Sequence, residues 1–391
     1  MKIYKLVIFL LLAVSCQIGE NANSIDSYRV INNISSIELD FDKIDSIKAS
    51  EFIKSFSYIV LPDNDAFIGT IDNFSILDSL FFITDKKTNA IYIYSLSGEL
   101  INIIKNVGRG PGEYYYIHKS WINKDKKQIE IYDRNSNKIL IYNIDGTFLR
   151  EFSSPGYVSS FCSKNAYRYY YRDKDGFYDD KGNSSNIHLL VTGDSSDNIR
   201  TYIQSSHFIN DVYNSVNFAE DDKSILFIMA QNDFIYLLDG MQIKELYHLK
   251  FKPTPLYDFP KYKDAKSYNE IKKISTSCIG CIGNLNHWFA SNKYIFFSFG
   301  KQREADVFTL GYVIYNRNDE SIKFMYNAIY NDIDSLNNWL HSPIYISDNM
   351  FIFVIYPYQL SSTQKILLSK FSDIDVLNND NPILVLAKLK I

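Results

Sequence analysis

The residues from position 108 to 114, Gly-Arg-Gly-Pro-Gly-Glu-Tyr, are the densest group in the chain that could bind a ligand. Glycines let the backbone adopt positive φ angles and let a ligand approach closely, and proline stiffens a loop. The segment is neither a dinucleotide fingerprint nor a P-loop, because it lacks the required glycine spacing and the Lys-Ser/Thr ending. The residues that could grip a polar ligand or stack on it are Arg109, Glu113, Tyr114 and Tyr115.

A second interpretation of this loop is structural, and we favour it. The loop is then a rigid crossover between two parts of the fold, in which Arg109 and Glu113 pair with each other or cap neighbouring strands. This interpretation predicts positive φ angles at the glycines, and that Arg109→Ala costs more than about 1 kcal/mol of stability. The residues that would build such a crossover are Gly108, Gly110, Pro111 and Gly112.

The segment Tyr167–Tyr178 mixes tyrosines with charged residues. Such a surface could stack on sugars or on a peptide. Alternation along a strand, with tyrosines facing the core and charges facing outwards, explains the same pattern, and we favour this second explanation.

Cys278 and Cys281, with His287 nearby, raise the question of redox or zinc chemistry. A redox Cys-x-x-Cys pair usually opens a helix in a βαβ context, which is absent, and a structural zinc needs four ligands. We therefore expect a local disulfide, or two buried thiols, with Cys162 left unpaired. No metal and no cofactor are predicted.

No catalytic group stands out elsewhere. Asp85 and Asp133 occupy equivalent places in a repeat, which favours a role in supporting turns over metal binding. The histidines lack metalloprotease spacing, and no Gly-x-Ser-x-Gly nucleophile motif occurs. The sequence predicts no catalytic residue.

The N-terminus has the features of an export signal. Lys2 and Lys5 precede an apolar run from Leu6 to Val14, which is too short to span a membrane and suits a signal peptide. The run ends in Ala-Val-Ser-Cys, similar to the lipobox of bacterial lipoproteins. We expect residues 1–15 to be the signal peptide, Cys16 to carry the lipid, and residues 16–35 to form a polar tether. The alternative is an ordinary cleaved signal with an incidental cysteine.

Composition narrows the function classes. The 391 residues carry 41 basic and 45 acidic side chains, so no basic footprint for nucleic acid is present. The abundance of Tyr (31) and Phe (27) indicates a strand-rich fold, because aromatic residues fit pleated surfaces.

An internal repeat indicates the architecture. Residues 83–98 and 131–146 align without gaps at an offset of 48. Each copy predicts a strand, a polar turn, a second strand, a tight turn at glycine and then a third strand. This period favours the four-stranded blades of a β-propeller, here spanning residues 36–391. The last segment, Asn381–Ile391, is expected to close the ring by pairing with Ile37–Phe41 or Tyr58–Leu61. Residues 253–292 are expected to be an insertion with a helix at Tyr262–Ile274.

These features resemble a known family. The chain is similar to the six-bladed β-propeller lipoproteins of Bacteroides and relatives in Ile59-Val-Leu-Pro-Asp63, the repeated strands, the glycine loop and the ending Asp380-Asn-Pro-Ile-Leu-Val-Leu-Ala-Lys-Leu-Lys390. The resemblance implies an all-β fold of six four-stranded antiparallel blades. It implies no particular reaction, since one fold carries many functions.

The expected function is a binding or scaffolding module, and we favour a role without enzymatic activity. We expect the protein to be held by lipid to the bacterial cell envelope, specifically to the outer membrane. Envelope proteins or glycans are the expected partners, besides the membrane, and nucleic acid is not. The alternative is a propeller enzyme, a hydrolase or lyase, with its site in the central channel.

Overall fold

The computed structural model describes residues 34–63, 66–172, 177–178, 184–193, 199–204, 217–229, 232–265, 267–304, 307–370 and 376–390. The predicted signal peptide and the lipidation site at Cys16 lie outside these ranges, as do residues 173–176 of the tyrosine-rich segment. The first strand begins at Ser35, the last residue of the predicted tether. Within the described ranges, no helix is long and apolar enough to cross a membrane.

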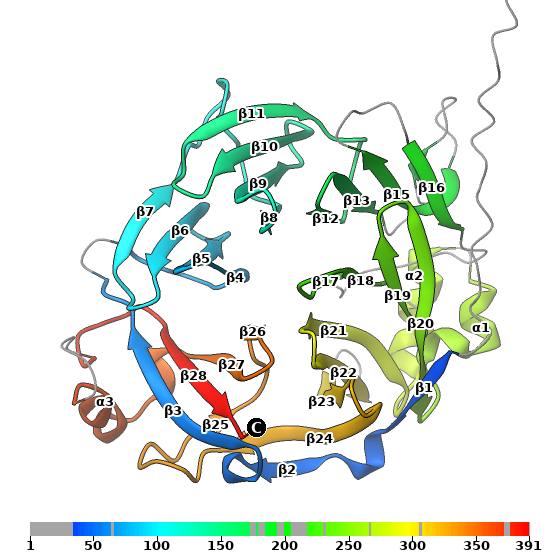
Figure 1. The fold of residues 1–391 in the computed structure, drawn as a ribbon. Helices are drawn as coiled ribbons and strands as arrows, with labels where there is room; N and C mark the ends of the chain where they lie inside the picture. Colours follow the sequence, from blue (N-terminus) through cyan, green and yellow to red (C-terminus); the bar gives the residue numbers. More distant parts are fainter. Residues whose placement is uncertain are drawn as a thin grey trace, which may run out of the picture.

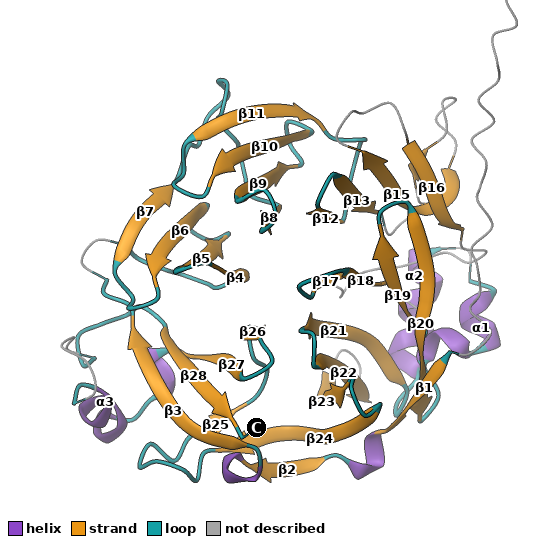
Figure 2. Cartoon of the chain, viewed as in Figure 1, coloured by secondary structure: helices purple, strands orange, loops and turns teal. Residues whose placement is uncertain are grey.

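The fold is an all-β propeller. The described strands form six sheets, which stand radially around a central axis (Figure 1). Figure 2 shows that strands make up the sheets and that the helices lie towards the outer rim. The innermost strand of each sheet faces the axis, so residues from six distant parts of the sequence meet there.

The first three sheets follow one another along the chain. The first contains β4 (Asn73–Leu77), β5 (Leu80–Asp85), β6 (Ala90–Ser95) and β7 (Leu100–Ile104). The second contains β8 (Lys119–Asn123), β9 (Gln128–Asp133), β10 (Lys138–Asn143) and β11 (Phe148–Ser153). The third contains β12 (Ser160–Lys164), β13 (Tyr167–Tyr171) and β15 (Ser184–Gly193), with β14 (Phe177–Tyr178) and β16 (Ile199–Gln204) both paired to β15.

The remaining sheets also include the N-terminal strands. The fourth contains β17 (Phe218–Glu220), β18 (Ile225–Ile228), β19 (Phe234–Asp239), β20 (Gln242–Lys252) and β1 (Ser35–Asp40). The fifth contains β21 (Ile282–Ala290), β22 (Tyr294–Glu304), β23 (Val307–Asn316), β24 (Ser321–Tyr330), β2 (Asp45–Lys48) and β25 (Trp339–Leu340). The last contains β26 (Tyr345–Ile346), β27 (Met350–Ile355), β28 (Ile383–Leu389) and β3 (Ile53–Val60).

The four-stranded antiparallel blades expected from the repeat are present, and three of the sheets carry additional strands. β1 and β2 lie parallel to β20 and β24 and extend two sheets at their outer edges. An outer edge strand has unpaired N–H and C=O groups, and an added strand satisfies them. The 48-residue repeat could not reveal this, because it covers only the first two sheets.

The repeated segments occupy equivalent places in adjacent sheets. Ile83 pairs with Tyr92, and Ile131 pairs with Leu140 in the same register. Asn89 and Asn137 both adopt positive φ in the turn, as do Gly98 and Gly146 in the next turn. The alignment at offset 48 therefore predicted backbone geometry as well as strand order.

The ring is closed by the two ends of the chain. β28 pairs antiparallel with β3, with Val385 opposite Tyr58. Of the two partners expected for the C-terminal strand, Tyr58–Leu61 is thus the correct one, while Ile37–Phe41 pairs with β20 instead.

Apolar side chains fill each junction between neighbouring sheets. Ile91 and Ile93 of the first sheet pack in one cluster with Ile129 and Ile131 of the second, all without solvent exposure. Comparable clusters lie at the other junctions. Each such side chain contributes roughly 1.5–3 kcal/mol by burial, so the ring is held mainly by contacts between blades.

The predicted helix at Tyr262–Ile274 is two helices. The helices of the described chain are α1 (Pro260–Lys263), α2 (Tyr268–Ser277) and α3 (Ser362–Leu368), with 3₁₀ turns η1 (Phe41–Lys43), η2 (Ala49–Glu51), η3 (Leu256–Asp258) and η4 (Pro357–Gln359). The Ser267 hydroxyl accepts a hydrogen bond from the Glu270 N–H, which starts a new helix inside the predicted one. The insertion also ends earlier than expected, because β21 begins at Ile282.

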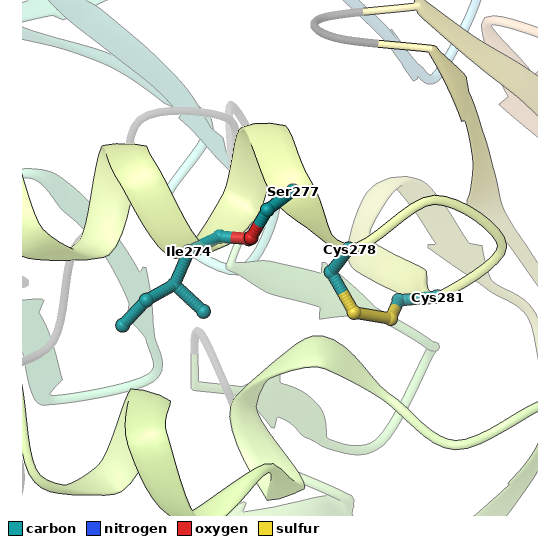
Figure 3. Close-up of a disulfide and its surroundings, with 4 residues drawn as sticks. All are labelled: Ile274, Ser277, Cys278 and Cys281. Carbon is teal, nitrogen blue, oxygen red and sulfur yellow. A yellow bond between two sulfur atoms is a disulfide. The ribbon is translucent and has the colours of Figure 1, made fainter.

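A disulfide joins Cys278 to Cys281 directly after α2 (Figure 3). The helix end is further held by the Ser277 hydroxyl, which donates to the Ile274 carbonyl over 2.8 Å. Cys162 is a free, buried cysteine, and burial raises the pKa of its thiol. A buried neutral thiol is unreactive, so Cys162 is a core residue.

Candidate functional site

The glycine loop is the crossover from β7 to β8. Val107 and Tyr114 form an isolated bridge, with hydrogen bonds from Gly108 N to Tyr114 O (3.1 Å) and from Tyr114 N to Asn106 O (2.9 Å). Glu113 caps the loop, since its carboxylate accepts the Gly110 N–H over 2.7 Å. These bonds hold the loop in one conformation without a ligand.

Tyr114 is a core residue. Its side chain has no exposed surface, and its hydroxyl lies 3.1 Å from the carbonyls of both Ile104 and Asn89. The prediction that Tyr114 contacts a ligand is therefore wrong, because nothing from solvent can reach the ring. Burial also raises its pKa, so the hydroxyl remains a neutral donor.

Gly112 is the glycine that the loop requires. Its φ is +74°, and a Cβ there would lie 2.8 Å from the Phe148 ring. Gly108 and Gly110 do not adopt positive φ, which corrects the expectation for them. At those two positions a Cβ would meet the flexible Glu113 carboxylate instead.

Arg109 and Glu113 do not form an ion pair within the described chain, contrary to one form of the structural interpretation. Arg109 is exposed, and its guanidinium lies over the exposed Tyr115 ring, 5.1 Å from the centroid. The loop is thus a crossover whose outer surface carries one Arg–Tyr pair.

The repeated aspartates anchor the crossovers. The Asp133 carboxylate is fully buried and accepts hydrogen bonds from Tyr115 N (2.8 Å), Asn135 N (2.9 Å) and Ser136 Oγ (2.7 Å). Asp85 accepts an equivalent bond from Gly69 N. Each aspartate joins its own turn to the incoming crossover, so the expectation of turn supports is confirmed. No cluster that could hold a metal ion occurs among the described residues.

The central channel holds a cavity of about 390 Å³. Residues of all six innermost strands line it, which is why no single stretch of sequence revealed it. The charged and histidine side chains among them are Asp72, Lys86, Lys119, Lys124, Glu220 and His287. The aromatic side chains are Phe74, Trp121, Phe161, Phe218, Trp288, Phe289 and Tyr345.

One end of the channel carries paired charges. This end is formed by the turns that follow the innermost strands. Glu220 lies 3.3 Å from Lys124 and 2.9 Å from Lys164, and its pair with Lys164 is buried, with side chains 7 % and 8 % exposed. The charge of Glu220 raises the pKa of Lys124, against the effect of burial. The carboxylate and ammonium groups at this end are therefore already engaged.

The same turns are linked to one another around the ring. Bonds between neighbouring blades run from Lys127 to Asp78 (2.7 Å), from Asn165 N to Asp125 (2.9 Å), from Asn292 to Asp222, and from Lys293 N to Asp348 (2.8 Å). Together with the Lys164–Glu220 pair, they join the six blades in sequence. This end is built for stability.

The opposite end is basic and aromatic. It is formed by the crossovers and by the turns after the second strands. Lys86 lines the cavity at this end together with Asp72, and the further cationic and aromatic side chains of these crossovers and turns are Tyr116, His118, Arg134, Tyr157 and Arg172. Neither Lys86 nor Arg134 forms a side-chain ion pair with another described residue.

The sequence contained one signal for this basic end. Lys86 and Arg134 lie 48 residues apart and follow Asp85 and Asp133 directly. The repeat therefore places one cation in the same turn of two adjacent blades. The repeat by itself predicts strands and turns, and it does not indicate that these two cations share a surface.

His118 connects this basic end to the fold. Its Nδ1 lies 3.1 Å from the Arg134 backbone N–H, which can only donate, so Nδ1 is unprotonated. Burial lowers the pKa of His118, and the charges of Arg134 and Lys86 lower it further, against the raising effects of the Tyr116 carbonyl and Asp133. The imidazole is therefore neutral at pH 7. Protonation would redirect Nδ1 to the Tyr116 carbonyl, 3.2 Å away.

Comparison with protein families shows the family to which the chain belongs. The model of the family described as "Domain of unknown function (DUF4934)" matches residues 32–388. The chain belongs to this family. Comparison of this DUF4934 chain with curated proteins gives no match.

Solved structures share the fold of the DUF4934 chain. A Bacteroides fragilis protein assigned as exported is 17 % identical, with a TM-score of 0.68 over 91 % of this chain and 100 % of that one. A member of the DUF4221 family from Bacteroides vulgatus is 9 % identical, with a TM-score of 0.51 over 86 % of this chain and 97 % of that one. At these identities the likeness shows the fold alone. It agrees with the resemblance to Bacteroides propellers, while the lipoprotein part of that resemblance stays a prediction.

Proposed function

We propose that the chain is a six-bladed propeller lipoprotein of the bacterial cell envelope, anchored to the outer membrane through Cys16, that binds a ligand at the basic end of its channel. The observation that carries the proposal is the difference between the two ends. At one end, charges pair with each other across blades. At the other, Lys86 lines a cavity of about 390 Å³, and further cations and tyrosines lie in the adjacent crossovers and turns. That volume lies within the range of small-molecule sites.

The number of blades is supported by the six sheets and by the apolar cluster at each junction. Export is supported by the N-terminal signal and by the fold shared with the exported Bacteroides fragilis protein. The disulfide between Cys278 and Cys281 fits an oxidising compartment outside the cytoplasm. Envelope proteins and glycans are the partners that such a location makes available.

We favour binding over catalysis because the channel carboxylates have structural roles. Asp72 accepts hydrogen bonds from the Thr70 hydroxyl and the Lys86 N–H, both at 2.8 Å. Glu220 is held by two lysines. A general acid or base must instead be free to exchange a proton with a substrate.

A channel-blocking substitution tests the proposed site. Ser75 lines the channel and is half-buried, so Ser75→Trp would fill the cavity, whereas Ser97→Trp at an exposed turn is the matched control. We expect Ser75→Trp to abolish capture of envelope glycans or proteins by the purified mature chain, with an unchanged melting temperature. Equal capture by both variants would place binding elsewhere.

A further inference from the structure

Alternation along the innermost strands shows which side chains face the channel. On β21, His287 is exposed and Phe289 is half-buried, whereas Trp288 between them has only 1 % of its surface exposed. Successive side chains of a strand point to opposite faces, so His287 and Phe289 face the channel, which both of them line. The same alternation on β4 places Asn73 and Ser75 on the channel side.

A tryptophan faces these residues from the other side of the channel. β8 belongs to the second of six sheets and β21 to the fifth, so the two strands lie opposite each other across the axis (Figure 1). Trp121 of β8 lines the channel and is half-buried. Its indole N–H donates to the Ser163 carbonyl over 2.9 Å, which holds the ring in one orientation. The channel thus contains a fixed aromatic surface, and a fixed surface loses little entropy when a ligand binds.

Three polar side chains of the channel wall have hydrogen-bonding capacity to spare. The Asn73 amide donates to the Ser120 carbonyl (3.0 Å) and hydroxyl (3.2 Å), which leaves its own carbonyl oxygen as an acceptor. Within the part of the chain that the structure describes, the Ser75 hydroxyl and the His287 imidazole have no hydrogen-bond partner. These groups are therefore available to a ligand.

His287 contributes to this site in its neutral form. The channel walls around it lower the pKa of the imidazole by desolvation, so the ring is uncharged at pH 7. A neutral imidazole has one nitrogen that donates and one that accepts, and a serine hydroxyl also does both. Such groups match the hydroxyl groups of a ligand, each of which donates and accepts in turn.

The charged side chains that line the cavity lie next to opposite charges or are already engaged. At the crossover end, the Asp72 carboxylate accepts the Lys86 N–H over 2.8 Å, so the two side chains are neighbours. At the other end, Glu220 lies 3.3 Å from Lys124. Lys119 has an interaction partner within the chain. An ionic ligand in the middle of the channel would therefore lose water without gaining a free counter-charge.

We propose that the ligand is a short neutral saccharide, whose hydroxyl groups bond to Asn73, Ser75 and His287. The C–H face of a sugar ring then lies against Trp121, because aromatic faces provide flat apolar contact. This inference rests on the proposed binding function and names its ligand class. A purely apolar ligand would fill the cavity of about 390 Å³ but would leave the three polar groups without partners.

The test is calorimetric titration of the mature, lipidated chain in a detergent that has no sugar head group. The probes are the neutral disaccharides of glucose, galactose and mannose, the uronic acid counterpart of each, and indole as a planar apolar molecule. We expect at least one neutral disaccharide to bind about tenfold or more tightly than its acidic counterpart and than indole. Its affinity should not change when sodium chloride is raised, because no charge is recognised.

His287→Leu is the decisive variant. It removes both ring nitrogens from a side chain that is open to the channel and has no partner in the described chain, so the fold should be unaffected. We expect it to weaken binding of the preferred disaccharide about tenfold, as for the loss of two neutral hydrogen bonds. His287→Gln is the matched control, since an amide keeps a donor and an acceptor, and its affinity should stay within about threefold of the parent. Ser75→Trp should abolish binding of the same probe.

Four outcomes would overturn the inference. If a uronic acid binds more tightly than its neutral counterpart, the site recognises charge. If indole binds as tightly as the disaccharides, the channel is an apolar pocket. If His287→Leu and His287→Gln both bind like the parent, the sugar lies elsewhere. If no disaccharide binds, the ligand class is wrong, and capture of envelope ligands by Ser75→Trp then shows whether the proposed channel site fails as well or stands with another ligand.

Discussion

The Tyr142 hydroxyl donates a hydrogen bond to the Gly112 carbonyl over 2.7 Å. Tyr142 belongs to the third strand of the second sheet and is fully buried, and burial raises its pKa to about 12. The bond ties the glycine loop to the interior of the blade that follows it. The loop is therefore part of the junction between two blades.

Gly112→Ala should destabilise the protein by about 2 kcal/mol or more. A Cβ at this residue is strained at φ +74° and collides with the Phe148 ring. Gly110→Ala is the control, because its Cβ would meet only the movable Glu113 side chain. Denaturant unfolding of both variants measures the difference, and equal losses would contradict the assigned geometry.

Arg109→Ala should change stability by less than about 0.5 kcal/mol, as expected for an exposed side chain. This revises the sequence-based expectation of more than about 1 kcal/mol, which assumed a buried pair with Glu113. Thermal unfolding is sufficient to check it. A large loss would mean that the Arg109–Tyr115 contact is worth more than a surface contact normally is.

Glu220→Gln should cost about 3 kcal/mol, because it removes the buried carboxylate 2.9 Å from Lys164 and leaves this ammonium with the more exposed Asp125 at 3.8 Å. Asp78→Asn removes the exposed partner of Lys127 at the same end of the channel and should cost less than about 1 kcal/mol. The free energies of unfolding of the two variants provide the comparison. Similar small losses would show that the Glu220 pairs do not hold the ring.

Stability should fall as the pH drops below about 6.5, the ordinary pKa of histidine. The folded pKa of His118 is lowered, so below 6.5 the unfolded chain binds more protons than the folded chain and acidification favours unfolding. The contribution is fully present above 6.5 and is lost as the pH falls through the folded pKa. His118→Asn keeps an acceptor for the Arg134 N–H and should reduce the fall of the melting temperature between pH 7 and pH 5. An unchanged dependence of the melting temperature on pH would refute this role of His118.

Cys16→Ala should release the protein into the soluble fraction and abolish metabolic labelling with a fatty acid. Stable anchoring needs more than one acyl chain, and a lipobox cysteine receives several. Membrane fractionation of labelled cells tests both parts. If the variant stays with the membrane, the N-terminus is not the anchor.

How much the sequence revealed depended on whether a feature was local. Asp85, Asn89 and Gly98 recur at 133, 137 and 146 because each supports a turn within a few residues, and their roles could be predicted. The partner of the C-terminal strand was narrowed to two segments, since both had the required apolar pattern. The choice between these two segments depends on how the blades pack around the ring, which the local sequence does not show.

The basic mouth could not be predicted in the same way. Tyr157 and Arg172 come from different blades and have nothing in common in the sequence that points to a shared site. Their proximity depends on the rotation between neighbouring sheets, which no local pattern encodes. The prediction that Tyr114 contacts a ligand failed for a related reason. The sequence shows three consecutive aromatic residues, but it does not show which of them the fold buries.

The first three strands of the chain can pair only after distant strands have been synthesised. β1, β2 and β3 pair with β20, β24 and β28, so each successive N-terminal strand waits for a strand nearer the C-terminus. A chain that emerges N-terminus first, from a ribosome or through a membrane, therefore leaves β1 unpaired until β20 (Gln242–Lys252) has followed, β2 until β24 (Ser321–Tyr330) has followed, and β3 until almost all 391 residues have followed. These pairings close very long loops of the chain, so we expect the final assembly of the propeller to be slow. The N-terminal segment therefore needs protection while its strands are unpaired.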